Sequence, residues 1–141
     1  MDAVRDDRGQ AVLLAAFIIA IAAAVLIGLQ LQQARAFALE RSRRAGEAAA
    51  EAATTAVADA YAAALREAVA KKRVMDIGRV IGSAATNDAA RAAAAEASAA
   101  NGGSAIDDVT LHCADRRVEV TILSSGASYR AGFPAGECSR R

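Results

Sequence analysis

The chain is short of the residues that usually build a large core or an active site. Aromatic residues make up 4% of its 141 residues, tryptophan is absent, and there is one histidine and one proline. The abundant alanine buries little apolar surface, so we expect only a thin core outside any membrane. A single proline suits long uninterrupted helices. The net charge of +1 supplies no basic field of the kind that indicates a nucleic-acid partner.

Motifs that carry chemistry are also absent from the sequence. There is no glycine-rich phosphate loop, no nucleophile elbow and no catalytic cysteine–histidine arrangement. A zinc site needs about four suitably spaced ligands, and His112, Cys113 and Cys138 do not supply them. We therefore expect no metal, no cofactor and no enzymatic activity.

One apolar run dominates what the sequence does contain. Residues 11–29, AVLLAAFIIAIAAAVLIGL, hold no charge and no proline. As a helix they would reach about 28 Å, close to the thickness of a bilayer's hydrocarbon core. We predict a transmembrane helix over residues 11–32, after a short polar tail at 1–10.

A cleaved signal peptide is the alternative interpretation of this N-terminus. Its apolar region is usually shorter, about 7–15 residues, and its first residues are usually net positive. Here three aspartates offset Arg5 and Arg8, although Ala22-Ala23-Ala24 could mimic a cleavage site. We retain the transmembrane helix as the prediction.

Residues 33–73 are predicted to form a helical stalk outside the membrane. Alanine, the best helix former, dominates from Ala45 to Ala70. Larger apolar residues repeat every four positions and predict a packing stripe on one face: Val57, Tyr61, Leu65 and Val69. This stripe could pack within its own domain or against another subunit, and the sequence leaves both possibilities open.

Residues 74–141 are predicted to form a small α+β domain. After a break at residues 74–82, a second alanine-rich helix would begin at a cap provided by Thr86, Asn87 or Asp88 and end before Asn101-Gly102-Gly103. Apolar and polar residues then alternate over 109–113 and 118–122, which predicts a β-hairpin with its turn at 114–116. Residues 124–141 are rich in glycine and serine, with Tyr129 and Phe133 as candidate anchors.

Whether the two cysteines form a disulfide depends on the compartment in which this domain lies. If this domain lies outside the cytoplasm, Cys113 and Cys138 could form a disulfide that fastens the tail to the hairpin and adds roughly 3 kcal/mol. The alternative is one core thiol and one free thiol in the tail. The positive-inside rule alone favours a cytoplasmic domain, because Arg35, Arg41, Arg43 and Arg44 follow the span, whereas Arg5 and Arg8 precede it. The short N-terminal tail and the cysteines favour the opposite orientation.

The order of these segments resembles one known family. Near its N-terminus the chain has Arg8-Gly9-Gln10-Ala11-Val12, a long apolar helix and an alanine-rich extension with regular charges. A later alanine-rich helix ending in Ala-Asn-Gly and the strands Asp108-Val109-Thr110-Leu111 and Val118-Glu119-Val120-Thr121 follow. This pattern is similar to the TadE/TadG-like proteins of bacterial tight-adherence (Flp-type) pili. The resemblance covers most of the chain. It implies a single-pass protein of the bacterial cell membrane with a cytoplasmic N-terminus and an extracytoplasmic C-terminal domain.

The resemblance also implies partners, and it has one departure. The expected partners are the lipid bilayer, pilin subunits and other pilus-assembly proteins, with homo- or hetero-oligomers formed through helices. Pilin-like members are cleaved after glycine, which would place the cut between Gly9 and Gln10, and carry glutamate at the fifth position after it, where this chain has Leu14. A membrane-retained assembly component is therefore the main hypothesis. The alternatives are a processed minor pilin in the filament, or a membrane-anchored scaffold or signalling subunit with a cytoplasmic domain.

Overall fold

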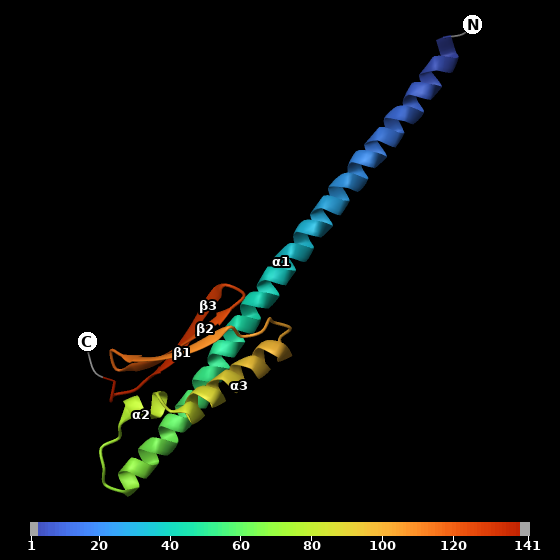
Figure 1. Cartoon of the computed structure of the whole chain (residues 1–141). Helices are drawn as coiled ribbons and strands as arrows, with labels where there is room; N and C mark the ends of the chain where they lie inside the picture. Colours follow the sequence, from blue (N-terminus) through green and yellow to red (C-terminus); the bar gives the residue numbers. More distant parts are fainter. Residues whose placement is uncertain (1–2, 139–141) are drawn as a thin grey trace. The chain divides into compact units, whose positions relative to one another are not determined.

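The computed structural model describes residues 3–138, with side chains from residue 12 onward. Three helices come first, α1 (Ala3–Ala70), α2 (Ile77–Ile81) and α3 (Ala84–Ala100). Three strands follow, β1 (Asp108–Ala114), β2 (Arg117–Ser124) and β3 (Ala127–Pro134) (Figure 1). The chain divides into two compact units, residues 1–39 and residues 40–141. The predicted α+β class with a long apolar N-terminal helix is confirmed.

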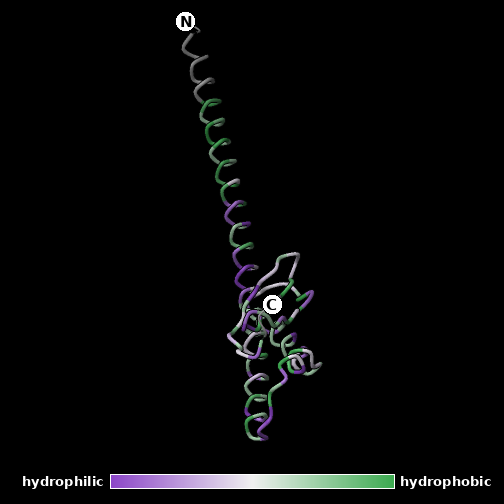
Figure 2. Tube along the Cα trace, turned by 90° about the vertical axis from the view of Figure 1, so that its left-hand side faces the viewer, coloured by the Kyte–Doolittle hydropathy of each residue, from purple (hydrophilic) through white to green (hydrophobic). Residues whose placement is uncertain are grey.

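The N-terminal unit is the apolar part of α1. Its large side chains from Val12 to Leu31 are between 49% and 71% exposed, and none of its most apolar window is buried. Figure 2 shows the apolar colour concentrated in this part of the helix. A contiguous exposed apolar surface of this extent is not stable in water, since monomeric soluble proteins rarely expose patches beyond a few hundred Å².

The C-terminal unit includes the second half of α1 in its core. Small residues of this helix are fully buried: Ala45, Gly46, Ala49, Ala50 and Ala53. Val57 follows them and is also inaccessible to solvent. The helix expected over residues 33–73 therefore packs within its own unit from Ala45 to Val57, because the small side chains let the other elements approach it closely. We call the C-terminal unit the head.

The sheet is antiparallel, with the strand order β1-β2-β3. The predicted hairpin is confirmed, with Val109 opposite Ile122 and Cys113 opposite Val118. Its turn residues Asp115 and Arg116 have φ values of 51° and 62°. Two consecutive positive φ angles are the geometry of the type I′ turn, whose twist matches that of the strands it joins.

The third strand was not predicted from the sequence. Residues 127–134 lie in the segment that we expected to be a glycine- and serine-rich tail, but they pair with β2 along its whole length. A second positive-φ turn, Ser125 (50°) and Gly126 (77°), reverses the chain before β3. Tyr129 and Phe133 do serve as anchors, because both pack against the core from this strand.

The core lies between one face of the sheet and the helices of the head. Val118, Val120 and Ile122 of β2 are fully buried, and Ala90 and Ala94 of α3 meet the same cluster. The second half of α1 and α3 lie side by side near the sheet (Figure 1). Alternation along β2 therefore places every second side chain in the core, as the period of a strand requires.

The ends of α3 differ partly from expectation. Its N-cap is Ser83, whose hydroxyl accepts a hydrogen bond from the Thr86 backbone N–H at 3.2 Å. The expected caps Thr86, Asn87 and Asp88 fall inside the helix, and Asn87 donates to the Ile81 and Ser83 carbonyls. The predicted end at Asn101-Gly102 is confirmed, with Gly102 at a φ of 67°. The expected break over 74–82 contains the short helix α2, capped by Asp76.

Candidate membrane anchor and surfaces of the head

The anchor is the candidate span in α1. By length and composition this helix could cross a membrane, and its apolar residues are exposed on all sides rather than packed in protein. A helix that is apolar all round requires an apolar surrounding. Leu14, where pilin-like proteins carry glutamate, is 62% exposed. The candidate cleavage position, Gly9 and Gln10, lies within α1, where the structure describes the helix but no side chains.

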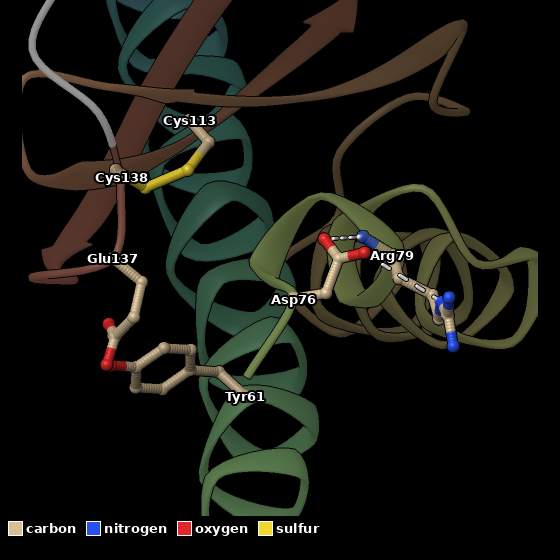
Figure 3. The surroundings of a disulfide bond; sticks show 6 residues. All are labelled: Tyr61, Asp76, Arg79, Cys113, Glu137 and Cys138. Carbon is tan, nitrogen blue, oxygen red and sulfur yellow. Dashed lines mark hydrogen bonds and ion pairs between the residues drawn. A yellow bond between two sulfur atoms is a disulfide. The ribbon is translucent and has the colours of Figure 1, made fainter. Parts of the chain in front are cut away.

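A disulfide joins Cys113 to Cys138, as one of the two sequence hypotheses expected (Figure 3). The bond connects β1 to the segment that follows β3, across a sequence separation of 25 residues. Cys138 is buried and Cys113 is half-buried, and both contribute to the core cluster. Structural disulfides persist in oxidising compartments and are rare in the cytosol. The bond therefore indicates an extracytoplasmic head.

Glu137, the residue before Cys138, connects the C-terminal segment to α1. Tyr61 donates a hydrogen bond from its hydroxyl to a carboxylate oxygen of Glu137 at 2.5 Å (Figure 3). The Tyr61 ring also lies 5.5 Å from the Phe133 ring, measured between centroids. The hydrogen bond to Glu137, together with partial burial and the carboxylate charge, raises the pKa of Tyr61 to about 12. Tyr61 thus fastens the end of the chain to the helix.

The predicted packing stripe is used along part of its length. Val57 is fully buried, Tyr61 and Leu65 are half-buried, and Val69 is 69% exposed. Residues four apart turn by about 40° around a helix at each step, so the stripe rotates by about 120° between Val57 and Val69. The stripe therefore winds away from the core. The same spacing extends back through Ala53, Ala49 and Ala45, which are buried.

An open cleft of about 290 Å³ lies where α1 ends and α2 begins. It is lined by residues of both helices and of the connection between them: Ala64, Glu67, Ala68, Arg73, Val74, Met75, Asp76, Arg79 and Val80. We call this feature the α1–α2 cleft. It was not predicted from the sequence, where the only signal was the basic run Lys71-Lys72-Arg73 followed by Val74.

The acidic residues of the α1–α2 cleft have basic partners. Glu67 accepts a hydrogen bond from Lys71, and this bond together with the Lys71 charge lowers the pKa of Glu67. Asp76 accepts from the Arg79 backbone N–H at 3.1 Å and faces the Arg79 guanidinium at 3.9 Å (Figure 3).

The structure places His112 on the exposed face of β1, as the strand's parity predicted. Across the described residues, no group of three or more histidine, cysteine, aspartate or glutamate side chains is arranged to hold a metal ion.

No protein-family model, curated protein or solved structure matches the chain. Its function is therefore argued from its own residues and geometry.

Proposed function

We propose that this protein is a non-enzymatic, single-pass component of a Flp-type tight-adherence pilus assembly system, similar to TadE/TadG-like proteins. The observation that carries the proposal is that the two parts of helix α1 lie in different surroundings. Its first part is apolar and unburied, and its second part enters the core of a disulfide-bonded head. The proposed orientation places the N-terminus in the cytoplasm of a bacterial cell and the head outside it.

Two features of the head support a role in assembly rather than catalysis. The second half of α1 and the three-stranded sheet pack into one core, and Cys113, Cys138, Tyr61 and Glu137 are engaged in contacts that hold this platform together. Such a platform would present surfaces to pilin subunits and to other membrane proteins of the assembly system. The apolar span would anchor it and pack laterally against neighbouring spans through its small residues, which include Gly28.

The orientation is tested with a membrane-impermeant maleimide on spheroplasts of the native host. We expect Cys113 and Cys138 to be labelled only after an impermeant reductant has opened their bond. The Cys113→Ser/Cys138→Ser double variant is the matched control and remains unlabelled. If labelling instead requires cell lysis and proceeds without reductant, the head is cytoplasmic and the alternative scaffold or signalling subunit is supported. The arginines that follow the span favour this alternative orientation.

The function is tested by deleting the gene in that host. We expect the cells to lose their surface pili and to regain them when the intact chain is supplied in trans. Normal piliation after deletion would refute the proposal. Failure of a truncated chain lacking the span to restore pili would show that membrane anchoring is required.

N-terminal sequencing of the mature protein separates the assembly component from the minor pilin. We expect an uncleaved chain that stays in the membrane fraction, because Leu14 lacks the charge that offsets a neighbouring subunit's N-terminus. A mature protein beginning at Gln10 and found in sheared filaments would instead identify a minor pilin. The Leu14→Glu variant should shift the protein toward cleavage, and no change in cleavage or membrane retention would refute our account of this position.

A further inference from the structure

We propose that the α1–α2 cleft is a docking site for an acidic polypeptide segment that inserts one apolar side chain. Its apolar lining consists of Ala64 and Ala68 of α1 with Val74, Met75 and Val80. Its charged lining residues are Arg73 and Arg79 together with Glu67 and Asp76. Both features lie within the head, so the inference requires only that the head be folded and does not depend on the pilus proposal.

Exposed apolar residues concentrate at this end of the head. Of its described large apolar side chains, three are at least 40% exposed, namely Val69, Val74 and Leu123. Val74 lines the cleft and is 97% exposed, and Val69 lies in the last turn of α1, next in sequence to the lining residue Ala68. A valine with almost no contacts adds nothing to the fold, whereas it gains apolar contacts once a partner covers it.

The size of the cleft favours a protein partner over a small molecule. Its 290 Å³ lies at the lower limit of pockets that enclose ligands, which span about 300–1,000 Å³. It is also open to solvent, so it would cover only part of a ligand. A shallow apolar site with charged lining residues instead suits an anchor residue from an interface, where a few buried side chains carry most of the binding energy.

The charged residues around the cleft indicate the sign of the partner's net charge. Residues 64–82 contain five basic side chains, Arg66, Lys71, Lys72, Arg73 and Arg79. They contain two acidic ones, Glu67 and Asp76. Both acids already pair with basic neighbours, Glu67 with Lys71 and Asp76 with Arg79. The cleft lining itself holds two basic and two acidic residues, so the surplus comes from the flanking Arg66, Lys71 and Lys72. This surrounding positive charge would attract acidic segments and repel basic ones, which sets specificity and association rate more than affinity.

The backbone at the end of α1 holds a lysine in a left-handed conformation. The Lys72 and Arg73 N–H groups donate to the Val69 and Ala68 carbonyls at 3.1 and 2.9 Å, which is the hydrogen-bond pattern of a Schellman motif. Lys72 therefore takes a φ of 50°, a conformation that usually belongs to glycine. A lysine at this position places a cation next to the cleft despite the less favourable backbone.

An anionic lipid surface and a second copy of this chain are the competing occupants. Lipid surfaces are bound by long amphipathic helices with a wide apolar face, whereas α2 has five residues and the apolar lining is confined to one cleft. A second copy would have to bring the same net positive region into contact with itself in a symmetric interface. Both arguments favour a different, acidic chain.

The test is site-specific photocrosslinking of the full chain in membranes of the native host. A photoreactive residue replaces Val69, an exposed residue next in sequence to the lining residue Ala68, and a control probe replaces Ala92, an exposed residue of α3. We expect an adduct at position 69 and none at position 92, with the partner peptide, mapped by mass spectrometry, carrying net negative charge. In the same background, Arg73→Glu and Val74→Asp should each lower the adduct yield by about fivefold or more, while Arg73→Lys keeps it.

Disulfide formation on a non-reducing gel verifies that each variant head has folded. Val74→Asp is the safest variant, because the valine is almost fully exposed and its replacement leaves the core unchanged. Equal adducts at positions 69 and 92, or no adduct at either, would overturn the proposal. So would adducts to lipid or to another copy of this chain, or a partner peptide that is neutral or basic. Adduct yields that are unchanged by both Arg73→Glu and Val74→Asp would overturn it as well.

Discussion

Loss of the Cys113–Cys138 bond should destabilise the head by a large fraction of its stability. The bond closes a loop with a sequence separation of 25 residues. In the chain-entropy model, opening a loop of this length costs about 3.5 kcal/mol at 25 °C, because the unfolded chain regains conformational freedom. Single domains are stable by only about 5–15 kcal/mol, and this core is filled largely by alanine and valine. The bond is therefore expected to be essential to the head's margin of stability.

The magnitude can be measured by urea denaturation of the full chain in mild detergent. Tyrosine fluorescence is a suitable signal, because the sequence lacks tryptophan and both tyrosines, Tyr61 and Tyr129, lie in the head. With m-values of about 1–3 kcal/mol/M, this loss of stability predicts a urea midpoint lowered by about 1.2–3.5 M. The oxidised chain is compared with the reduced chain and with Cys113→Ser/Cys138→Ser, whose midpoint should not respond to reductant. A midpoint lowered by less than about 0.5 M would refute the reasoning.

Three further predictions concern single contacts of the head. Replacing Tyr61 by Phe should lower the free energy of unfolding, measured by urea denaturation, by about 0.5 kcal/mol, since the hydrogen bond to Glu137 is exposed to solvent. The raised pKa of Tyr61 means that this stability is present below pH 10 and is lost as pH rises toward 12. An absorbance titration should show one late-ionising phenol that shifts to lower pH in Glu137→Gln; an unshifted titration would contradict the assignment. Gly103→Ala should destabilise by about 2 kcal/mol, because its Cβ would lie 2.5 Å from the Cβ of Ala45 and from Oγ of Ser98. Gly136→Ala, with its nearest atom 4.0 Å away, is the control and should stay near wild type. Lys72→Gly should stabilise by about 0.5–1 kcal/mol by removing a side chain from a left-handed position, and a lower midpoint would show that Lys72 makes stabilising contacts.

The sequence predicted the elements whose signals are local. The long apolar run, the Asn101-Gly102 stop and the alternation over Val118–Ile122 each depend on a few neighbouring residues, and the structure bears them out. Strand β3 was missed because alanine, glycine and serine interrupt its apolar alternation and hide the Ser125-Gly126 turn.

Features that depend on distant residues were harder to predict. The buried alanines of α1 carry no amphipathic contrast, so nothing in the sequence separated a core helix from a stalk. The α1–α2 cleft arises from how Lys72 ends α1 and where the connection then places Val74, which no periodic pattern encodes. The cysteine pairing could be stated as one of two hypotheses, because its geometry depends on where the segment after β3 returns to β1.

The alanine-filled interior has a consequence for how this protein can change. Ala49, Ala53, Ala90 and Ala94 are each fully buried, and alanine can lose no more volume except by becoming glycine. Almost every substitution at these positions therefore adds atoms to a space that is already full, and an interior of protein density does not yield easily. Variation in such a head is expected to accumulate on its outer faces and at the α1–α2 cleft, leaving the helix–sheet contact nearly fixed in size.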